Sequence, residues 1–282
     1  MKKILITGAN SYIGTSFEQW MKQYDGYQIN TVDTMDGKWI TADFTMYDTV
    51  FHVAGIAHIK ETKGNAPLYY KVNRDLAIEV AAKAKRSGIK QFILMSSMSV
   101  YGMTAGVITK DTVPTPKSNY GKSKLEADIE IMEMSDNNFK VAILRPPMIY
   151  GKGSKGNYPR LSDLAKKTPV FPSKKNQRSM LHIDNLCEFI KLMIDNNEHG
   201  IFYPQNREYI KTAELVRTIS ELNGKKVIML PLFNPLLKLL SKRVTTFNKL
   251  FGNLVYDKAM SAYNDWSYCV NGFEESIRKT ER

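Results

Sequence analysis

The residues of this sequence that could do chemistry together are a tyrosine, a lysine and a serine. In the stretch SNYGKSKLEA, residues 118–127, Tyr120 and Lys124 stand four positions apart in a polar segment typical of the start of a helix. That spacing places both side chains on one helical face. The lysine charge, acting directly or through a ribose, would favour the phenolate and lower the tyrosine pKa from about 10. A tyrosine tuned in this way can exchange a proton with an alcohol or carbonyl oxygen.

A serine earlier in the chain could act on the same oxygen. The segment MSSMSVYG, residues 95–102, follows an apolar run and supplies Ser97, whose hydroxyl would polarise that oxygen. Serines here could instead suggest a hydrolase nucleophile, but no Gly-x-Ser-x-Gly elbow surrounds them.

The elements that must position these residues are strands alternating with helices. The runs KKILITG, YQINTVD, TVFHVAG, KQFILMSS and FKVAILRPP predict buried strands. Helical patterns cover 11–24, then 68–88 up to Gly88, and a further helix opens at 118. Strands that are apolar along their whole length predict a parallel sheet covered on both faces. The connection 39–51 is too short for a full helix, so either a crossover is trimmed there or two strands meet by a loop.

We therefore predict an α/β fold with a doubly wound, Rossmann-type parallel sheet and a smaller C-terminal substrate-binding lobe. Residues 1–150 would form the dinucleotide-binding domain and also supply the serine, tyrosine and lysine. Residues 151–282 would form the smaller lobe, with helical patterns near 160–167, 183–196 and 211–223 and short strands near 201–204 and 226–230.

The first strand-to-helix turn predicts a dinucleotide site. In TGANSYIG, Gly8 and Gly14 lie where backbone N–H groups and a helix N-terminus can hold a pyrophosphate, and Ser11 replaces the usual middle glycine. Asp33 ends the second strand, where it would accept hydrogen bonds from ribose hydroxyls and repel a 2′-phosphate. NAD is therefore favoured over NADP, although Lys38 lies close in sequence. Asp43 could sit near the adenine or be an ordinary loop acid.

Composition narrows the classes of function. The chain has 282 residues, 43% of them hydrophobic, with a net charge of +12 and two cysteines. Nothing suggests a signal peptide, a transmembrane span, a disulfide framework or a metal site, so we expect a cytoplasmic protein without metal. The charge suits anionic partners, but no basic run interleaved with aromatics supports nucleic acid. The apolar, basic segment 230–252 could be a membrane-surface helix or, more simply, a lobe helix.

Together the motifs resemble the extended short-chain dehydrogenase/reductase family of nucleotide-sugar epimerases, dehydratases and ketoreductases. TGANSYIG, FHVAG, VNRDLA, MSSMSVYG, YGKSK, LRPPMIYG and RSMLHIDNL occur in the family's order and spacing over almost the whole chain. RPPMIYG, NQRSMLHIDNL and FNKLFGNLVYD further resemble the small enzymes of capsule and O-antigen synthesis that reduce a UDP-linked 4-keto-6-deoxy-N-acetyl sugar.

The resemblance implies roles for individual residues. Tyr120 would be the catalytic acid/base, with Lys124 as its pKa partner and ribose ligand and Ser97 as the third member of the triad. The implied cofactor-binding residues are Gly8, Asn10, Ser11, Tyr12, Ile13, Gly14, Asp33, Asp43, Ala54, Gly55, Asn73, Tyr120, Lys124 and Pro146. The implied substrate-binding residues are Ser97, Ser99, Tyr120 and Arg178, the last of which would bind the sugar-nucleotide diphosphate. Met148 departs from the family, because many epimerases carry an asparagine there.

The function that this resemblance implies is an NAD(P)-dependent oxidoreductase acting at C4 of a nucleotide-diphosphate sugar, with a homodimer as an allowed assembly. Family dehydratases carry an Asp-Glu pair just after the triad serine, where this chain has Met98 and Ser99. Dehydration is therefore not expected. The resemblance to capsule enzymes and the short C-terminal lobe favour a reductase of a UDP-4-keto-6-deoxy-N-acetylhexosamine. A UDP-sugar 4-epimerase that retains NAD is the alternative. A non-catalytic dinucleotide-sensing regulator is the alternative from another class.

Overall fold

The structure, a computed structural model, describes every residue except 58, 60, 63, 174 and 232–251. Most of the segment 230–252 thus lies outside the described residues. Backbone contacts divide the chain into two units, which are described separately. Unit 1 comprises Met1–Gly102, Val113–Pro147 and Leu186–Pro204, and unit 2 comprises Met103–Thr112, Met148–Asn185 and Gln205–Arg282. Each unit draws on segments from both sides of residue 150.

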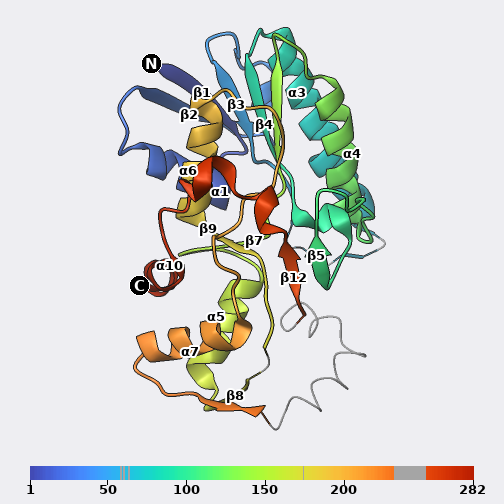
Figure 1. The fold of residues 1–282 in the computed structure, drawn as a ribbon. Coiled ribbons are helices and arrows are strands. Elements are labelled where there is room, and N and C mark those ends of the chain that lie inside the picture. The colour runs from blue at the N-terminus through green and yellow to red at the C-terminus, as the bar shows by residue number, and fades with distance from the viewer. Residues whose placement is uncertain (58, 60, 63, 174, 232–251) are drawn as a thin grey trace. The chain divides into compact units, whose positions relative to one another are not determined.

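A six-stranded parallel sheet forms the centre of unit 1 (Figure 1). In spatial order its strands are β10 (Gly200–Phe202), β6 (Lys140–Leu144), β4 (Gln91–Met95), β3 (Thr49–His52), β1 (Lys2–Thr7) and β2 (Tyr27–Val32). Strands β3 and β4 are buried along their whole length, which explains their unbroken apolar sequence. The predicted Rossmann-type α/β fold is confirmed.

Helices cover both faces of this sheet (Figure 1). They are α1 (Tyr12–Met21), α2 (Ala66–Tyr70), α3 (Leu76–Arg86), α4 (Asn119–Glu133) and α6 (Ile183–Asp195), the last of which begins in unit 2. On one face, Val50 and Phe92 share a core with Ala77 of α3 and Ala127 of α4. On the other, Phe17 of α1 meets Phe51 edge-on at 5.4 Å between ring centroids. Successive strand residues therefore serve opposite helix layers.

The chain passes from β2 to β3 without a helix, so the crossover is the trimmed one of the two alternatives. The connection contains a single 3₁₀ turn, η1 (Lys38–Ile40). Trp39 and Phe44, 6% and 1% exposed, fill the missing helix's place in the core shared with α3. Strands β2 and β3 flank β1 on opposite sides, so the strand order reverses beside β1. The crevice at the carboxyl ends of β1 and β3 is the position where this fold class binds dinucleotides.

One π turn interrupts the long helical segment predicted over 68–88. Helix α2, the π turn η2 (Lys71–Asp75) and α3 follow one another directly, and Gly88 ends the segment with φ +76°. Such turns re-aim one side chain out of the helical pattern and are frequent at functional sites. Here the turn carries Asn73, which is fully buried.

Short parallel strand pairs and helices build the described part of unit 2. The pairs are β5 (Gly106–Ile108) with β12 (Leu254–Tyr256), β7 (Met148–Tyr150) with β9 (Met180–His182), and β8 (Val170–Pro172) with β11 (Ile228–Leu230). The helices are α5 (Asn157–Lys167), α7 (Thr212–Leu222) and α10 (Phe273–Glu281). Leu161, Leu215 and Ile277 bring the three helices into one apolar core.

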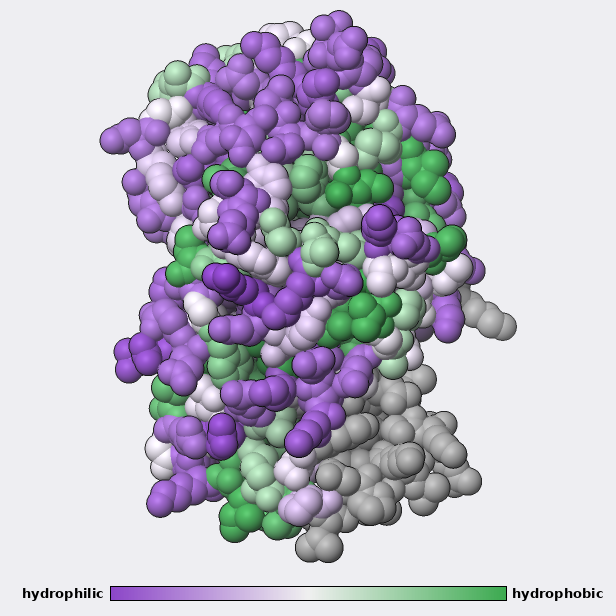
Figure 2. All heavy atoms as spheres, in the orientation of Figure 1, coloured by the Kyte–Doolittle hydropathy of each residue, from purple (hydrophilic) through white to green (hydrophobic). Residues whose placement is uncertain are grey.

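The visible surface is mostly hydrophilic, with apolar residues scattered in small groups (Figure 2). Within the described residues, no helix combines the length and apolarity needed to span a membrane.

Candidate active site

Helix α4 begins against the turn that carries the serines. Ser118 caps the helix, its Oγ accepting from the Gly121 N–H at 3.1 Å. A Cβ at Gly121 would lie 2.6 Å from the Ser99 carbonyl oxygen, so glycine is what lets the helix approach this turn. The glycine and serine around Tyr120 therefore serve to place the tyrosine beside Ser97.

Ser97 is fixed at the end of β4, where it caps the 3₁₀ turn η3 (Met98–Tyr101). Its Oγ accepts from the Ser99 backbone N–H at 3.1 Å and contacts the Ser99 hydroxyl at 3.1 Å. The backbone N–H of Met98 donates to the Pro146 carbonyl at 2.9 Å, which links this turn to the end of β6. Ser97 is half-buried and Ser99 is exposed, so the hydroxyl can face a reactant.

The phenol of Tyr120 is hydrogen-bonded to Ser97 and packs beside Tyr69 with ring centroids 6.4 Å apart. Burial raises the pKa of Tyr120 above its ordinary value, and the Ser97 hydrogen bond opposes the rise. The spacing predicts that Lys124 lowers this pKa, but in the structure the pKa rises, and Lys124 is not among the groups that shift it. At neutral pH the phenol is protonated and can donate a proton.

Lys124 points into the unit rather than into solvent. Its Nζ donates to the Met95 carbonyl at 2.8 Å, and the residue is 4% exposed. Burial lowers the pKa of Lys124 to about 8, with the charge of Asp128 opposing that change. The lysine is still largely protonated at neutral pH and supplies a fixed positive charge at the end of β4.

Asn73 ties the turn after β3 to helix α4. Its side-chain amide exchanges two hydrogen bonds with the backbone of Ile56, at 2.9 and 3.1 Å, and donates to Ser123 Oγ at 3.3 Å. Ser123 in turn donates to the Tyr120 carbonyl at 3.0 Å. The π turn therefore orients a link between the turn after β3 and helix α4.

The first turn has the form of a dinucleotide cradle. Ser11 adopts ordinary extended angles, φ −71° and ψ 145°, and its Oγ accepts from the Gly14 N–H at 3.1 Å to cap α1. The replacement of glycine is thus tolerated, but Ser11 occupies one N–H at the helix start. Asn10 takes a positive φ of 64°, while Tyr12 and Ile13 are half-buried on the first turn of α1.

Two glycines allow close approach at the carboxyl ends of β1 and β3. A Cβ at Gly8, where φ is +110°, would lie 2.6 Å from the backbone nitrogen of Ala54. A Cβ at Gly55 would lie 3.0 Å from Asn73 Oδ1 and 3.3 Å from Lys124 Nζ. A side chain at either position would collide with its neighbours. The glycine turns, the start of α1 and Lys124 together fit a bound dinucleotide, which approaches the backbone closely in this fold class.

The two acids predicted for the nucleotide lie in surface loops of unit 1. Asp33 follows β2, and its Oδ1 accepts from the Met35 N–H at 2.8 Å. Lys38, the cation that could attract a 2′-phosphate, is paired with Asp36 at 2.9 Å. Asp43 is exposed and bonded to Thr45, which fits an ordinary loop acid as well as an adenine contact.

Arg178 lies in unit 2, on backbone fixed from both sides. Its N–H and C=O each bond Ile210, at 2.9 Å, and its Nη1 donates to the Gly252 carbonyl at 3.0 Å. Burial lowers the pKa of this guanidinium, because the charge has lost much of its hydration. An arginine in such surroundings suits an anionic ligand.

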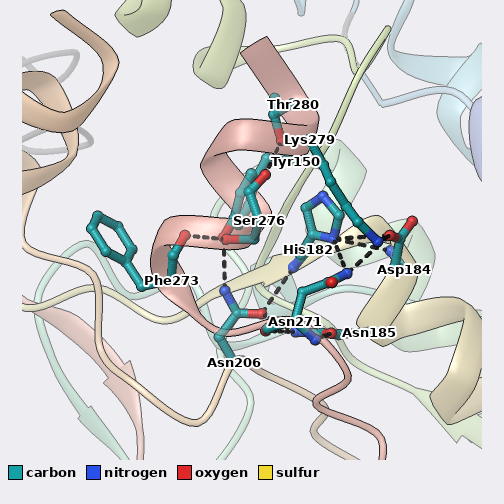
Figure 3. Close-up of polar contacts among 10 residues, drawn as sticks. All are labelled: Tyr150, His182, Asp184, Asn185, Asn206, Asn271, Phe273, Ser276, Lys279 and Thr280. Atoms are coloured by element: carbon teal, nitrogen blue, oxygen red, sulfur yellow. Dashed lines mark hydrogen bonds and ion pairs between the residues drawn. The ribbon is translucent and has the colours of Figure 1, made fainter. Parts of the chain in front are cut away.

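A buried polar network supports the strand that follows Arg178 (Figure 3). Asn206 Nδ2 donates to the Tyr150 hydroxyl at 2.9 Å, and its Oδ1 accepts from the His182 backbone N–H at 3.0 Å. Tyr150 also bonds Ser276 of α10 at 2.7 Å. The network joins β7, β9 and the C-terminal helix, which makes it a scaffold within unit 2.

Comparison with known proteins now adds to this geometry. The model of the family described as "NAD dependent epimerase/dehydratase family" matches residues 4–203. The chain belongs to this family. The match includes the dinucleotide turn, Ser97, Tyr120 and Lys124, and it confirms the resemblance that the motifs carry.

Relatives of known name extend the match beyond residue 203. UDP-glucose 4-epimerase of Vibrio cholerae is 29% identical, over 89% of this chain and 83% of the relative. The N-acetyl-α-D-glucosaminyl-diphospho-ditrans,octacis-undecaprenol 4-epimerase of Escherichia coli O157:H7 is 26% identical, over 83% and 76%. A crystal structure of UDP-glucuronic acid 4-epimerase from Bacillus cereus in complex with NAD has a TM-score of 0.75 at 18% identity, over 99% and 96% of the two chains.

This epimerase/dehydratase family member is therefore an enzyme of the short-chain dehydrogenase/reductase type, and its cofactor is NAD, the dinucleotide that the family's description names. Within the described residues, no group of three or more His, Cys, Asp and Glu side chains is arranged to hold a metal ion. The structure brings Ser97, Ser99, Tyr120, Lys124, Asn73 and the first turn together in unit 1, while Arg178 belongs to unit 2.

We expect Asp33 to make the enzyme prefer NADH over NADPH. Its carboxylate would repel a 2′-phosphate, and Lys38 is already paired with Asp36. Fluorescence titration should give on the order of tenfold tighter binding of NADH, and Asp33→Ala should narrow that ratio. Asp36→Ala, which frees Lys38, should strengthen NADPH binding and leave NADH binding unchanged. Tighter binding of NADPH by the wild-type protein would contradict this assignment.

Two buried histidines should make the protein sensitive to acid. Burial lowers the pKa of His52 to about 3 and that of His182 to about 4, from 6.5. Because the unfolded chain binds these protons first, the two histidines contribute their full stability above pH 6.5. That contribution falls as the pH drops towards 4 for His182 and towards 3 for His52. Denaturant unfolding should lose at most about 1.4 kcal/mol per pH unit for each histidine. His182→Gln should reduce this slope; a slope equal to that of the wild type would contradict the assignment.

Proposed function

We propose that this enzyme is a 4-epimerase of a UDP-linked hexose. The observation that carries the proposal is the hydrogen-bonded pair of Ser97 and Tyr120 beside buried Lys124, on the crevice of a dinucleotide fold. Two relatives are named as 4-epimerases, which supports C4 of the sugar as the position of the reaction. The same names favour epimerisation over the reduction that the capsule-type motifs suggest. Met98 and Ser99 provide no carboxyl group for dehydration.

Each residue has a defined task in this proposal. Tyr120 exchanges a proton with the C4 oxygen, and Ser97 donates a hydrogen bond to the same oxygen. Lys124 holds the cofactor ribose and keeps a positive charge near the phenol. Arg178 binds the diphosphate through charge-assisted hydrogen bonds. NAD, when bound, supplies reversible hydride acceptance at C4.

The test is product analysis with separate substrates. The protein with NAD is incubated with UDP-glucose, UDP-galactose and their N-acetyl forms, and the sugar protons are followed by NMR. We expect interconversion at C4 without net production of NADH. Parallel samples contain polyprenyl-diphospho-N-acetylglucosamine, or UDP-4-keto-6-deoxy-N-acetylhexosamine with NADH.

The parallel samples decide between the alternatives. Epimerisation of the polyprenyl substrate alone would move the proposal from a nucleotide carrier to a lipid carrier. Stoichiometric oxidation of NADH by the keto sugar would replace the epimerase with the reductase. Tight NADH binding with no turnover of any sugar would favour the non-catalytic regulator.

A further inference from the structure

A buried ionic cluster lies behind Lys124 in unit 1, and the proposed reaction does not use it directly. Asp128, one turn further along α4, is 1% exposed. Its Oδ2 accepts from Ser96 Oγ at 2.8 Å and from Arg145 Nε at 2.9 Å. Its Oδ1 has no hydrogen-bond partner among the residues that the structure describes.

Burying such an ion pair in a core costs free energy, because both charges lose their hydration. The side chains of Arg145 and Asp128 are 6% and 1% exposed, and removing charges of this kind from water costs several kcal/mol per ion. A well-packed apolar pair would serve packing equally well. The ion pair thus suggests a task other than packing.

The contacts of the cluster lead to three consecutive residues at the end of β4. Lys124 bonds the carbonyl of Met95, and Asp128 bonds the side chain of Ser96. The next residue is Ser97, whose hydroxyl bonds Tyr120. Asp128 therefore touches the strand end that carries the proposed catalytic serine and shares a helix with the lysine and tyrosine.

We propose that Asp128, paired with Arg145, is a positioning residue that stabilises the protonated ammonium of Lys124 and fixes the strand end at Ser96. Arginine cannot lose its proton under these conditions. Its contact with Oδ2 favours the charged carboxylate and opposes the effect of burial, which raises the pKa of Asp128. The role of Lys124 in the reaction is taken from the proposed function, whereas the effect of Asp128 on Lys124 does not depend on it.

The charges around Lys124 agree with this arrangement. Burial lowers the pKa of Lys124 to about 8, and Asp128 is the anion that opposes the change. Of the other titratable groups facing the lysine, His52 from β3 stays neutral with a pKa of about 3, and burial holds the Tyr120 phenol protonated. Arg145 of unit 1 lies beyond the carboxylate, to which it is paired. Without Asp128, Lys124 would lose its proton at a lower pH.

The test is the variant Asp128→Asn/Arg145→Gln, which makes the cluster neutral while keeping its shape. Lysine labelled at the side chain reports the titration of Lys124 by NMR, with the resonance assigned from Lys124→Met. We expect the titration midpoint and the alkaline limb of kcat/KM to fall by about one pH unit or more. Because the NMR titration needs no substrate, it stands even if the sugar has been misassigned.

The controls separate a tuned charge from simple packing. Lys85→Gln/Asp136→Asn removes an exposed ion pair from the same unit and should leave the midpoint unchanged. Asp128→Glu keeps the negative charge, so the titration midpoint of Lys124 should stay close to that of the wild type. If the double variant does not fold, Asp128→Asn alone provides the test. The titration midpoint of Lys124 should then fall further than in the double variant, because Arg145 stays charged. An unchanged midpoint in a folded variant would reduce the cluster to a structural ion pair.

Discussion

Substitution of Tyr120 by phenylalanine is expected to lower turnover of the sugar by roughly 10²- to 10⁴-fold. The change removes the only atom that exchanges a proton in the proposed reaction, but it keeps the ring that packs beside Tyr69. The cofactor crevice of Gly8, Gly55 and Lys124 is untouched. NADH affinity, measured by fluorescence titration, should therefore stay close to that of the wild type while kcat collapses.

Tyr24→Phe is the matched control for this prediction. Tyr24 donates to Glu188 at 2.7 Å on the side of α1 and α6, and burial raises its pKa to about 12. Its loss removes a hydrogen bond of the same kind without touching Ser97 or Lys124. A Tyr120→Phe enzyme whose turnover lies within a few-fold of Tyr24→Phe would rule out Tyr120 as the acid/base.

Replacement of Arg178 by alanine is expected to raise KM for the sugar substrate by about 10- to 100-fold. Hydrogen bonds between a guanidinium and a diphosphate contribute about 1.5–3 kcal/mol, which corresponds to this range. Arg178→Lys keeps the charge but loses the planar fork, so it should recover only part of the affinity. NADH titration should give unchanged affinity in both variants.

Arg217→Ala provides the comparison within unit 2. Arg217 is an exposed residue of α7 that approaches Glu221 at 3.9 Å, and its removal should leave KM unchanged. The opposite pattern, with weakened NADH binding and normal KM in Arg178→Ala, would remove Arg178 from the substrate site.

The strands of the sheet could be predicted because burial on both faces leaves apolar runs such as FILM in β4. The gap between β2 and β3 could not be resolved in the same way. Trp39 and Phe44 substitute for a helix by long-range packing against α3, and no local period records such packing. Likewise, nothing near residue 200 indicates that β10 pairs with β6, because the three residues of β10 carry little pattern.

The residues of the candidate site likewise fall into those that local sequence reveals and those that only the fold brings together. Tyr120, Lys124 and Ser97 stand out because residue type and short spacing carry the signal. The buried partners of the lysine do not, since Asp128 meets Ser96 and Arg145 only through the fold. One signal was available in the sequence: Asp128 repeats the four-residue step from Lys124, which places it on the same helical face.

The most direct test of C4 epimerisation uses a UDP-hexose that carries deuterium at C4. The protein is supplied with NAD in ordinary water, and the product epimer is isolated and examined by mass spectrometry and NMR. Our account predicts that the product keeps deuterium at C4, because the hydrogen removed there is returned to the same carbon without exchange with solvent. Tyr120→Phe should form this product only at its reduced rate. An epimer with ordinary hydrogen at C4 would contradict the account, as would labelled substrate that remains unconverted while NADH accumulates.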